Sequence, residues 1–162
     1  MDWNEYFMRH VYLAASKSKD PKTKIGAVLV RENNIIATGY NGFPIGVKDL
    51  PERYNERELK YKFVCHAEAN SVLASARFGI STKGASLYSQ GLPCSECAKT
   101  LIQAGISAIY IHKQWPNLIH SDAWVKSIEI SNIMFCEADI PIVVIDKELG
   151  ITGFLDGKIV NV

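Results

Sequence analysis

Two short segments of the sequence gather side chains that bind transition metals. The first, CHAEAN, contains His66 and Glu68, and the second, LPCSECAK, contains Cys94 and Cys97. Zinc prefers imidazole and thiolate ligands, and three such ligands leave its fourth position for water. Bound zinc lowers the pKa of that water from about 15.7 to about 7, which makes hydroxide available at neutral pH. The pattern therefore indicates a metal centre for hydrolysis, in which Glu68 carries protons and does not bind the ion.

The elements that position these residues are predicted to be helices that begin at the candidate ligands. Cys94 and Cys97 are three residues apart at the start of one helix, so both thiols lie on the same face. His66 and Glu68 open another helix, predicted for residues 67–78. Two helix N-termini that converge on one point would place partial positive charge beside an anionic group.

Two plainer interpretations of the same residues stay open. A single CxxC motif in a chain with reduced thiols is often a redox pair. Alternatively, Cys65 completes a structural zinc site with four protein ligands. Cys65 and His66 are adjacent, however, and a helix entrance makes it awkward for both to point the same way. Cys65 and Cys136 are more simply interpreted as small buried residues.

The apolar pattern of the whole chain predicts an α/β protein with a mixed sheet and helices on both faces. Strands are predicted at residues 25–30, 35–40, 85–89, 107–112 and 140–146, and helices at 3–18, 67–78, 95–104 and 121–137. Residues 31–34 indicate one hairpin turn, and Asp156-Gly157 indicates another. Residues 41–63 are polar and irregular, although 54–61 also fits a short helix. The alternation of strands and helices implies parallel neighbours with right-handed crossovers.

The composition excludes several classes of protein. The chain has 162 residues, enough for one core, and we expect a single domain over 1–162. A net charge of +1 gives no electrostatic reason to bind long nucleic acid. The sequence contains no apolar run of about 18 residues, so it predicts no membrane span. The N-terminal segment also lacks the apolar core of a signal peptide. We therefore expect a cytoplasmic protein with reduced thiols, which favours metal binding or catalysis for its cysteines.

Longer motifs around the candidate ligands resemble the deoxycytidylate (dCMP) deaminase branch of the cytidine deaminase superfamily. The motifs are DPKTKIGAVLV, TGYNGFPIGV, ERELKY, VCHAEANSVLASAR and LYSQGLPCSECAKTLIQAGI, which fall between Asp20 and Ile106. The pair H-x-E and P-C-x-x-C is the signature of zinc deaminases. The resemblance implies a three-layer α/β/α fold with a mixed five-stranded sheet. It covers over half of the chain and is weaker after Ile111.

The resemblance also implies roles for individual residues. His66, Cys94 and Cys97 would bind a catalytic Zn²⁺, and Glu68 would be the general acid and base. Water activated by the metal would add to C4 of the cytosine ring of dCMP while Glu68 protonates N3. Glu68 would then pass a proton to the amine, which leaves as ammonia, and the product would be dUMP, a precursor for thymidylate. Backbone N–H groups near Ala67 and Cys94 would stabilise the developing tetrahedral oxygen.

The remaining substrate contacts are expected from the strand ends and helices near this centre. Asn41 in GYNG matches the asparagine that contacts the sugar in the superfamily, although a turn residue is the alternative. A monophosphate needs cations or N–H donors, and Lys24 and Arg77 are the candidates, with a solvated surface charge as the alternative for each. Arg77 matches an arginine of this branch near a subunit contact. The candidates to pack against the base are Tyr40, Phe43 and Tyr88, of which Tyr88 better fits ordinary core packing.

Many members of the branch are hexamers that dCTP activates and dTTP inhibits with Mg²⁺, and the GYNG loop belongs to that effector site. In this chain the loop consists of Gly39, Tyr40, Asn41 and Gly42. The basic residues that follow are candidates to meet a triphosphate: Lys48, Arg53, Arg57 and Lys60. Nearby acidic residues almost cancel these charges, so a solvated loop is the alternative. The resemblance thus implies a homo-oligomer, with a hexamer expected.

Other functions remain as alternatives. A deaminase acting on tRNA adenosine or on free nucleosides is disfavoured by the near-zero net charge and the long insertion at 41–66. A zinc-stabilised binding module without turnover would need four protein ligands. No second zinc site is indicated, because the remaining candidates are scattered: Cys136, His10, His112 and His120. Trp115, Trp124 and His120 are expected in the core or at a subunit interface.

Overall fold

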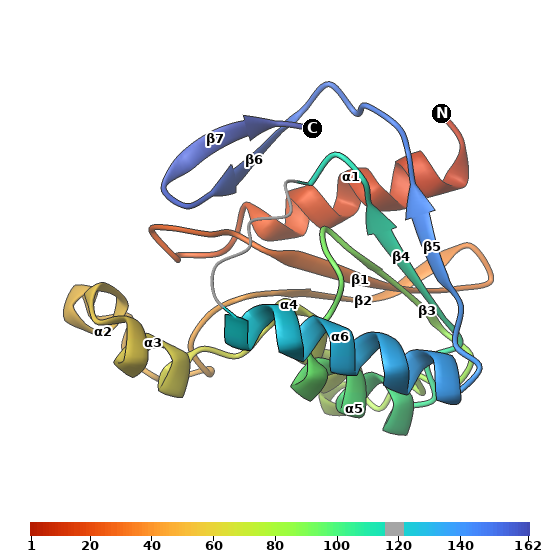
Figure 1. The fold of residues 1–162 in the computed structure, drawn as a ribbon, viewed down its shortest axis with the longest axis horizontal. Coiled ribbons are helices and arrows are strands. Elements are labelled where there is room, and N and C mark those ends of the chain that lie inside the picture. The colour runs from red at the N-terminus through yellow and green to blue at the C-terminus, as the bar shows by residue number, and fades with distance from the viewer. Residues whose placement is uncertain (116–121) are drawn as a thin grey trace.

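The computed structural model describes residues 1–115 and 122–162, which form three layers around one sheet (Figure 1). The sheet has the strand order β2-β1-β3-β4-β5. Its strands are β1 (Gly26–Arg31), β2 (Asn34–Tyr40), β3 (Ser86–Ser89), β4 (Ala108–His112) and β5 (Ile142–Ile145). β1 pairs antiparallel with β2 and β3, whereas β3, β4 and β5 are parallel. The predicted mixed five-stranded sheet is therefore confirmed.

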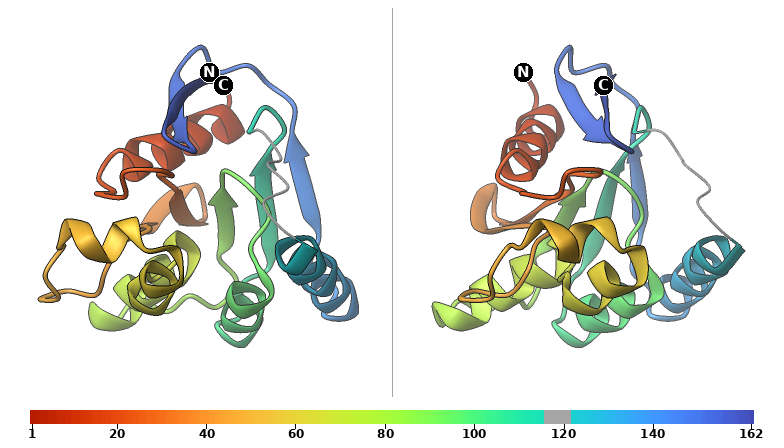
Figure 2. Two further views of the ribbon diagram at one scale, coloured as in Figure 1. Left: turned by 60° about the vertical axis from the view of Figure 1, so that its left-hand side comes forward. Right: turned by 90° about the vertical axis from the view of Figure 1, so that its left-hand side faces the viewer.

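Helices cover both faces of this sheet, as predicted. One face carries α1 (Trp3–Ala15), and the other carries α4 (Ala67–Arg77), α5 (Ser95–Gln103) and α6 (Asp122–Glu137) (Figure 1). A hairpin of β6 (Thr152–Leu155) and β7 (Lys158–Asn161) lies on the α1 side. Two short helices, α2 (Pro51–Asn55) and α3 (Arg57–Phe63), stand together at one side of the molecule (Figure 2). They replace the single short helix suggested at 54–61. None of the helices in the described ranges is long and apolar enough to cross a bilayer.

Separate apolar clusters hold the two outer layers to the sheet. The cluster under α1 and the hairpin includes Phe7, Val11, Val28, Tyr88, Trp115 and Leu155. The cluster under α4, α5 and α6 includes Leu29, Ala67, Leu87, Leu101, Ile109 and Phe135. Tyr88 and Trp115 are thus core residues. Cys136 is exposed, so the prediction that it is buried is wrong, because α6 turns Ser131 and Phe135 towards the sheet instead.

α1 ends at Ala15, three residues before its predicted end. Its start is capped by Asp2, whose carboxylate accepts a hydrogen bond of 2.8 Å from the Glu5 N–H. Beyond its end, the Ser18 hydroxyl donates to the carbonyl oxygen of Asn41 at 2.8 Å. This bond directs the chain away from the helix axis and ties the loop before β1 to the end of β2.

Both predicted hairpin turns are present. Glu32 and Asn33 both have positive φ, as do Asp156 and Gly157, which is the backbone that a two-residue type I′ turn requires. His120 and the predicted first residue of the last helix, Ser121, lie outside the described residues.

Candidate metal centre

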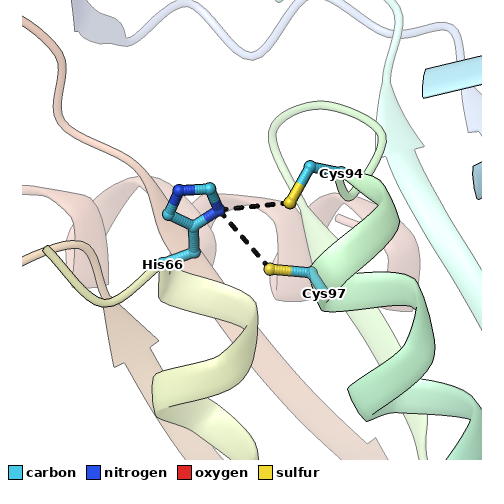
Figure 3. Close-up of side chains that lie close together, drawn as sticks. All are labelled: His66, Cys94 and Cys97. Carbon is cyan, nitrogen blue, oxygen red and sulfur yellow. Dashed lines mark hydrogen bonds between the residues drawn. The ribbon is translucent and has the colours of Figure 1, made fainter. Parts of the chain in front are cut away.

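The side chains of His66, Cys94 and Cys97 meet at the N-terminal ends of α4 and α5 (Figure 3). Nδ1 of His66 lies 3.4 Å from the Cys94 Sγ and 3.5 Å from the Cys97 Sγ. Tetrahedral zinc, with Zn–S bonds of about 2.3 Å and Zn–N bonds of about 2.1 Å, places nitrogen and sulfur ligands about 3.6 Å apart. The two distances from His66 therefore fit a zinc ion almost without movement, and all three ligand atoms lie within 4.8 Å of one another.

Both helices begin at the ligands, which is why the sequence brings these side chains together. His66 and Cys94 are the N-cap residues of α4 and α5, with extended backbone and no side-chain capping bond. Cys97 lies in the first turn of α5, on the same side as Cys94. Because α4 and α5 pack against each other, both helix ends present their ligands to one point.

Cys65 does not join the cluster. Its backbone instead pairs with Gly42, through N–H to carbonyl bonds of 2.8 Å and 3.1 Å. Within residues 1–115 and 122–162, the group of possible metal ligands at this point contains one histidine and two cysteines. A structural site with four protein ligands is therefore disfavoured, and the set leaves a position for water.

Glu68 lies beside the ligands, in the first turn of α4. It is buried, and its Oε2 lies 3.7 Å from the Cys97 Sγ. Burial raises the pKa of the Glu68 carboxyl, against the opposing effect of His66. A carboxyl group with a raised pKa can both accept and return a proton near neutral pH.

The surroundings of Cys94 favour its thiolate form. A hydrogen bond from the Cys97 thiol, followed by one from His66, lowers the pKa of Cys94 to about 4, although burial opposes this. His66 and Cys97 each form a hydrogen bond with Cys94. These bonds raise the pKa of the His66 imidazole to about 9 and raise the pKa of the Cys97 thiol. Since zinc binds neutral imidazole and thiolate, its binding would release the protons held by His66 and Cys97.

Asn41 lies at the same end of the sheet and is tied to the ligand segment through Gly42 and Cys65. Its side chain is buried. Its Oδ1 accepts a hydrogen bond of 2.8 Å from the Ile25 N–H, and its Nδ2 donates to the Thr23 carbonyl at 2.8 Å. Through these bonds the Asn41 side chain holds the loop before β1 in place.

The two phosphate candidates lie apart from each other. Lys24 lines a cavity of about 400 Å³ between the end of α1 and the β6–β7 hairpin, with its Nζ 5.8 Å from the centre of the Phe154 ring. None of the metal-ligand candidates lines this cavity. Arg77 lies in the last turn of α4, which at 1.5 Å per residue is roughly 15 Å along the axis from Ala67. Arg77 thus lies far from the metal centre of its own chain.

Several residues that were expected to contact a nucleotide effector or the cytosine base instead contact other residues of the chain. Lys60 forms an ion pair with Asp20, and Arg53 lies over the Phe63 ring, 4.6 Å from its centre. Phe43 stacks on Tyr54 with ring centres 4.3 Å apart. Tyr40 remains partly exposed. Part of the insertion at 41–66 is therefore packed, whereas Lys48 and Arg57 are exposed.

Three polar groups that hold the surrounding loops and helices were not predicted from the sequence. Asp20 is completely buried, and Ser127 of α6 accepts a hydrogen bond from the Ser95 N–H at the start of α5. Gln90 is also fully buried, and its amide bonds to the Gly26 N–H and the Lys24 carbonyl. The only available signal was the position of Gln90, a polar residue directly between a predicted strand and the P-C-x-x-C motif.

Comparisons with known proteins agree with this geometry. Residues 1–113 match the family model described as the cytidine and deoxycytidylate deaminase zinc-binding region. An uncharacterized deaminase in the luxG 3′ region of Aliivibrio fischeri is 36% identical over 140 residues, which cover 86% of this chain and 91% of that protein. Human deoxycytidylate deaminase is 44% identical over 115 residues, which cover 67% of this chain but only 64% of that enzyme.

The fold also matches a solved structure. The dCMP deaminase of cyanophage S-TIM5, crystallised in complex with dCMP and dUMP, superposes with a TM-score of 0.65 at 24% identity, covering 87% of this chain and 95% of that one. Because the family model spans well over half of the sequence and includes all three candidate zinc ligands, the chain belongs to the cytidine and deoxycytidylate deaminase family.

Proposed function

We propose that the chain hydrolyses dCMP to dUMP and ammonia. The observation that carries this proposal is the convergence of His66, Cys94 and Cys97 with Glu68 buried beside them. Three ligands and a separate proton carrier are what hydrolysis at a metal requires, whereas a purely structural site needs neither an open position nor a buried acid. The similarity to deoxycytidylate deaminases supports the choice of substrate.

In this reaction the zinc ion held by the three ligands would supply water activated to a pKa of about 7. Glu68 accepts one proton of the attacking water and delivers it to N3 as the oxygen adds to C4. Glu68 then moves the second proton from that oxygen to the amino group, so that the C4–N bond breaks and ammonia leaves. The raised pKa of Glu68 suits both transfers.

The first backbone N–H groups of the two helices assist this step. The N–H groups near Ala67 and Cys94 lie where the helices begin, and such groups lack partners within the helix. They stabilise the oxygen as negative charge develops on it. Asn41 contacts the deoxyribose, and Lys24, which makes no ion pair within the described ranges, meets the phosphate. Any phosphate contact from Arg77 must come from a neighbouring subunit.

The finer properties implied by the family follow as part of the same proposal. The product dUMP serves thymidylate synthesis in the cytoplasm, and the chain assembles as a hexamer. The retained GYNG segment, residues 39–42, supports activation by dCTP and inhibition by dTTP with Mg²⁺.

The test measures ammonia release and zinc content on the same preparations. We expect the wild-type protein to prefer dCMP over CMP, deoxycytidine, dCTP and tRNA. Glu68→Gln is expected to keep its zinc but to lose about 10³-fold in kcat. Glu96→Gln, which changes an exposed glutamate in the first turn of α5, is the control and should retain both. Loss of zinc from Glu68→Gln would make Glu68 a ligand, and a preference for deoxycytidine would contradict the phosphate contact.

A further inference from the structure

We propose that Gln90 is a positioning residue that fixes Lys24 relative to the zinc ligand Cys94. The inference rests on the proposed deamination of dCMP and on Lys24 as its phosphate contact. It adds the residue that determines where this cation lies relative to the metal, and therefore how strongly the enzyme prefers a nucleotide to a nucleoside.

Gln90 lies at the point where β1 and β3 stop pairing. At the C-terminal end of β3, the final backbone pair between the two strands is Ala27 with Ser89. One residue further on, the side chain of Gln90 takes the place of the ladder. Its Oε1 accepts a hydrogen bond of 2.7 Å from the Gly26 N–H, and its Nε2 donates to the Lys24 carbonyl at 3.2 Å. A single amide thus joins the two strand ends.

The partners of this amide determine its orientation. The N–H of Gly26 only donates and the carbonyl of Lys24 only accepts, so turning the amide by 180° would lose both bonds. The side chain of Gln90 is fully buried, and bonds in such a place are not exchanged for bonds to water. The amide therefore holds the segment before β1 in one defined position.

Both polar groups of the Lys24 backbone are used in this arrangement. Its N–H donates to the carbonyl of Phe154 in the β6–β7 hairpin at 3.0 Å, and its carbonyl accepts from Gln90. Its side chain lines the cavity of about 400 Å³ between α1 and the hairpin and forms no ion pair with the described residues. Gln90 and the hairpin thus clamp the backbone of Lys24 and leave its ammonium available to an anion.

The backbone of Gln90 belongs to the loop that leads to the metal ligands. Cys94 follows four residues later, directly after the fully buried Pro93. The carbonyl of Gln90 accepts a hydrogen bond of 3.2 Å from the N–H of His112 at the end of β4. Because the backbone of Gln90 is held by β4, loss of its side-chain bonds should release Lys24 without displacing the thiols.

The experiment compares kcat/KM for dCMP and for deoxycytidine, which lacks the phosphate. We expect the wild-type enzyme to prefer dCMP by at least about tenfold, the equivalent of one charged hydrogen bond. Gln90→Met keeps the length of the side chain but removes both bonds. It should lose about tenfold on dCMP, mainly through KM, and stay within about twofold of wild type on deoxycytidine, with zinc content unchanged. Equal losses on the two substrates would reduce Gln90 to a folding role and overturn the inference.

Gln90→Glu tests the same bonds and replaces Gln90→Met if that variant does not fold. A protonated carboxyl can still donate to the Lys24 carbonyl, whereas an ionised one cannot. Burial raises the pKa of such a carboxyl, so the preference for dCMP should be close to that of wild type near pH of about 6 and fall about tenfold below it near pH of about 8. A preference that follows wild type at every pH would contradict the inference.

Two further variants show whether Gln90 acts through Lys24. Lys24→Met should lower kcat/KM for dCMP at least as much as Gln90→Met, and the double variant should lose no more than Lys24→Met alone. Additive losses would mean that Gln90 acts elsewhere. Gln103→Met, the same substitution at an exposed glutamine that ends α5, is the control and should change neither substrate.

The outcomes for the wild-type enzyme separate this inference from the proposed function. Equal use of dCMP and deoxycytidine would refute the phosphate contact of Lys24 and the inference with it, while leaving the deaminase proposal in place. No ammonia from either would refute the deaminase proposal. Calorimetric affinities for dUMP and deoxyuridine then decide the inference without turnover, since Gln90→Met should weaken only dUMP, by about tenfold.

Discussion

Gly39 lies so close to α4 that a Cβ atom at this position would be 2.2 Å from the carbonyl oxygen of Ala67. The nitrogen of Ser71 would be only 2.5 Å away, and neither backbone atom can move without shifting the helix. Ala67 and Glu68 are the first two residues of that helix. The absence of a side chain at Gly39 is thus what allows α4 to lie directly on β2 and to deliver Glu68 to the metal centre.

Replacing Gly39 by alanine should therefore destabilise the protein. We expect Gly39→Ala to lower the free energy of unfolding by about 3 kcal/mol, the upper end of the usual cost of overpacking. Gly42→Ala in the same motif is the control, since its Cβ would meet only the Tyr40 ring, at 3.9 Å, and should change stability by less than about 1 kcal/mol. Urea denaturation of both variants measures the difference. Similar values for the two would show that the glycine of β2 is not needed for packing.

The sequence was most informative where function depends on local spacing. The i, i+3 spacing of Cys94 and Cys97, and helices that begin at His66 and Cys94, follow from rules that act within a few residues. The ion pair between Asp20 and Lys60 could not be predicted in this way, because 40 positions separate the two residues and an isolated charge is usually on the surface. Cys136 illustrates the opposite error, since its burial depends on which face of α6 meets the sheet.

Removal of zinc is expected to destabilise the fold as well as to abolish activity. The ligands come from two helix ends, so the ion links α4 to α5. At free zinc about 1,000-fold above its dissociation constant, binding contributes about 4 kcal/mol to the free energy of unfolding. Chelation should lower the thermal midpoint accordingly, and zinc, but not Mg²⁺, should restore it, because thiolates are poor ligands for Mg²⁺.

Cysteine variants provide the matched comparison for this effect. Cys97→Ser should lose both the ion and the shift in thermal midpoint, whereas Cys136→Ser, at an exposed cysteine, should keep both. Metal analysis and calorimetry of the two variants give the answer. A thermal midpoint for Cys97→Ser that still responds to zinc would place the stabilising ion elsewhere.

His112 should make stability depend on pH. Its imidazole is buried between the Tyr12 hydroxyl, at 2.7 Å from Nδ1, and the Lys147 carbonyl, at 2.8 Å from Nε2. Burial lowers the pKa of His112, against the opposing effect of the Lys147 carbonyl. In the unfolded chain a histidine has a pKa of about 6.5, so below that value the unfolded state binds a proton that the native state does not. Stability should therefore be complete above pH of about 6.5 and fall as the pH drops towards the lower native pKa.

The measurement is the free energy of unfolding at several pH values between about 5 and 8. One proton contributes a slope of at most about 1.4 kcal/mol per pH unit. His112→Gln lowers the baseline stability but should remove this part of the slope, since glutamine does not titrate. An unchanged slope in the variant would assign the pH dependence to other groups.

Ser127 is expected to support the metal centre from α6. Its hydroxyl accepts a hydrogen bond of 3.0 Å from the Ser95 N–H and lies 2.9 Å from the Ser95 hydroxyl. That N–H belongs to the first turn of α5, where it has no partner within the helix, directly beside Cys94. Ser127→Ala should cost about 1 kcal/mol of unfolding free energy and about tenfold in zinc affinity, as loss of a group that orients a ligand does.

Ser131, one turn further along α6, provides the control for Ser127. It is fully buried, and its hydroxyl has no hydrogen-bond partner in the described part of the chain. Ser131→Ala removes an unsatisfied polar group, so it should leave zinc affinity unchanged and stability equal or higher. Urea denaturation and zinc competition against a chromophoric chelator measure both quantities. Equal zinc affinity in the two variants would show that α6 only covers the sheet and does not help to hold the ligands of α5.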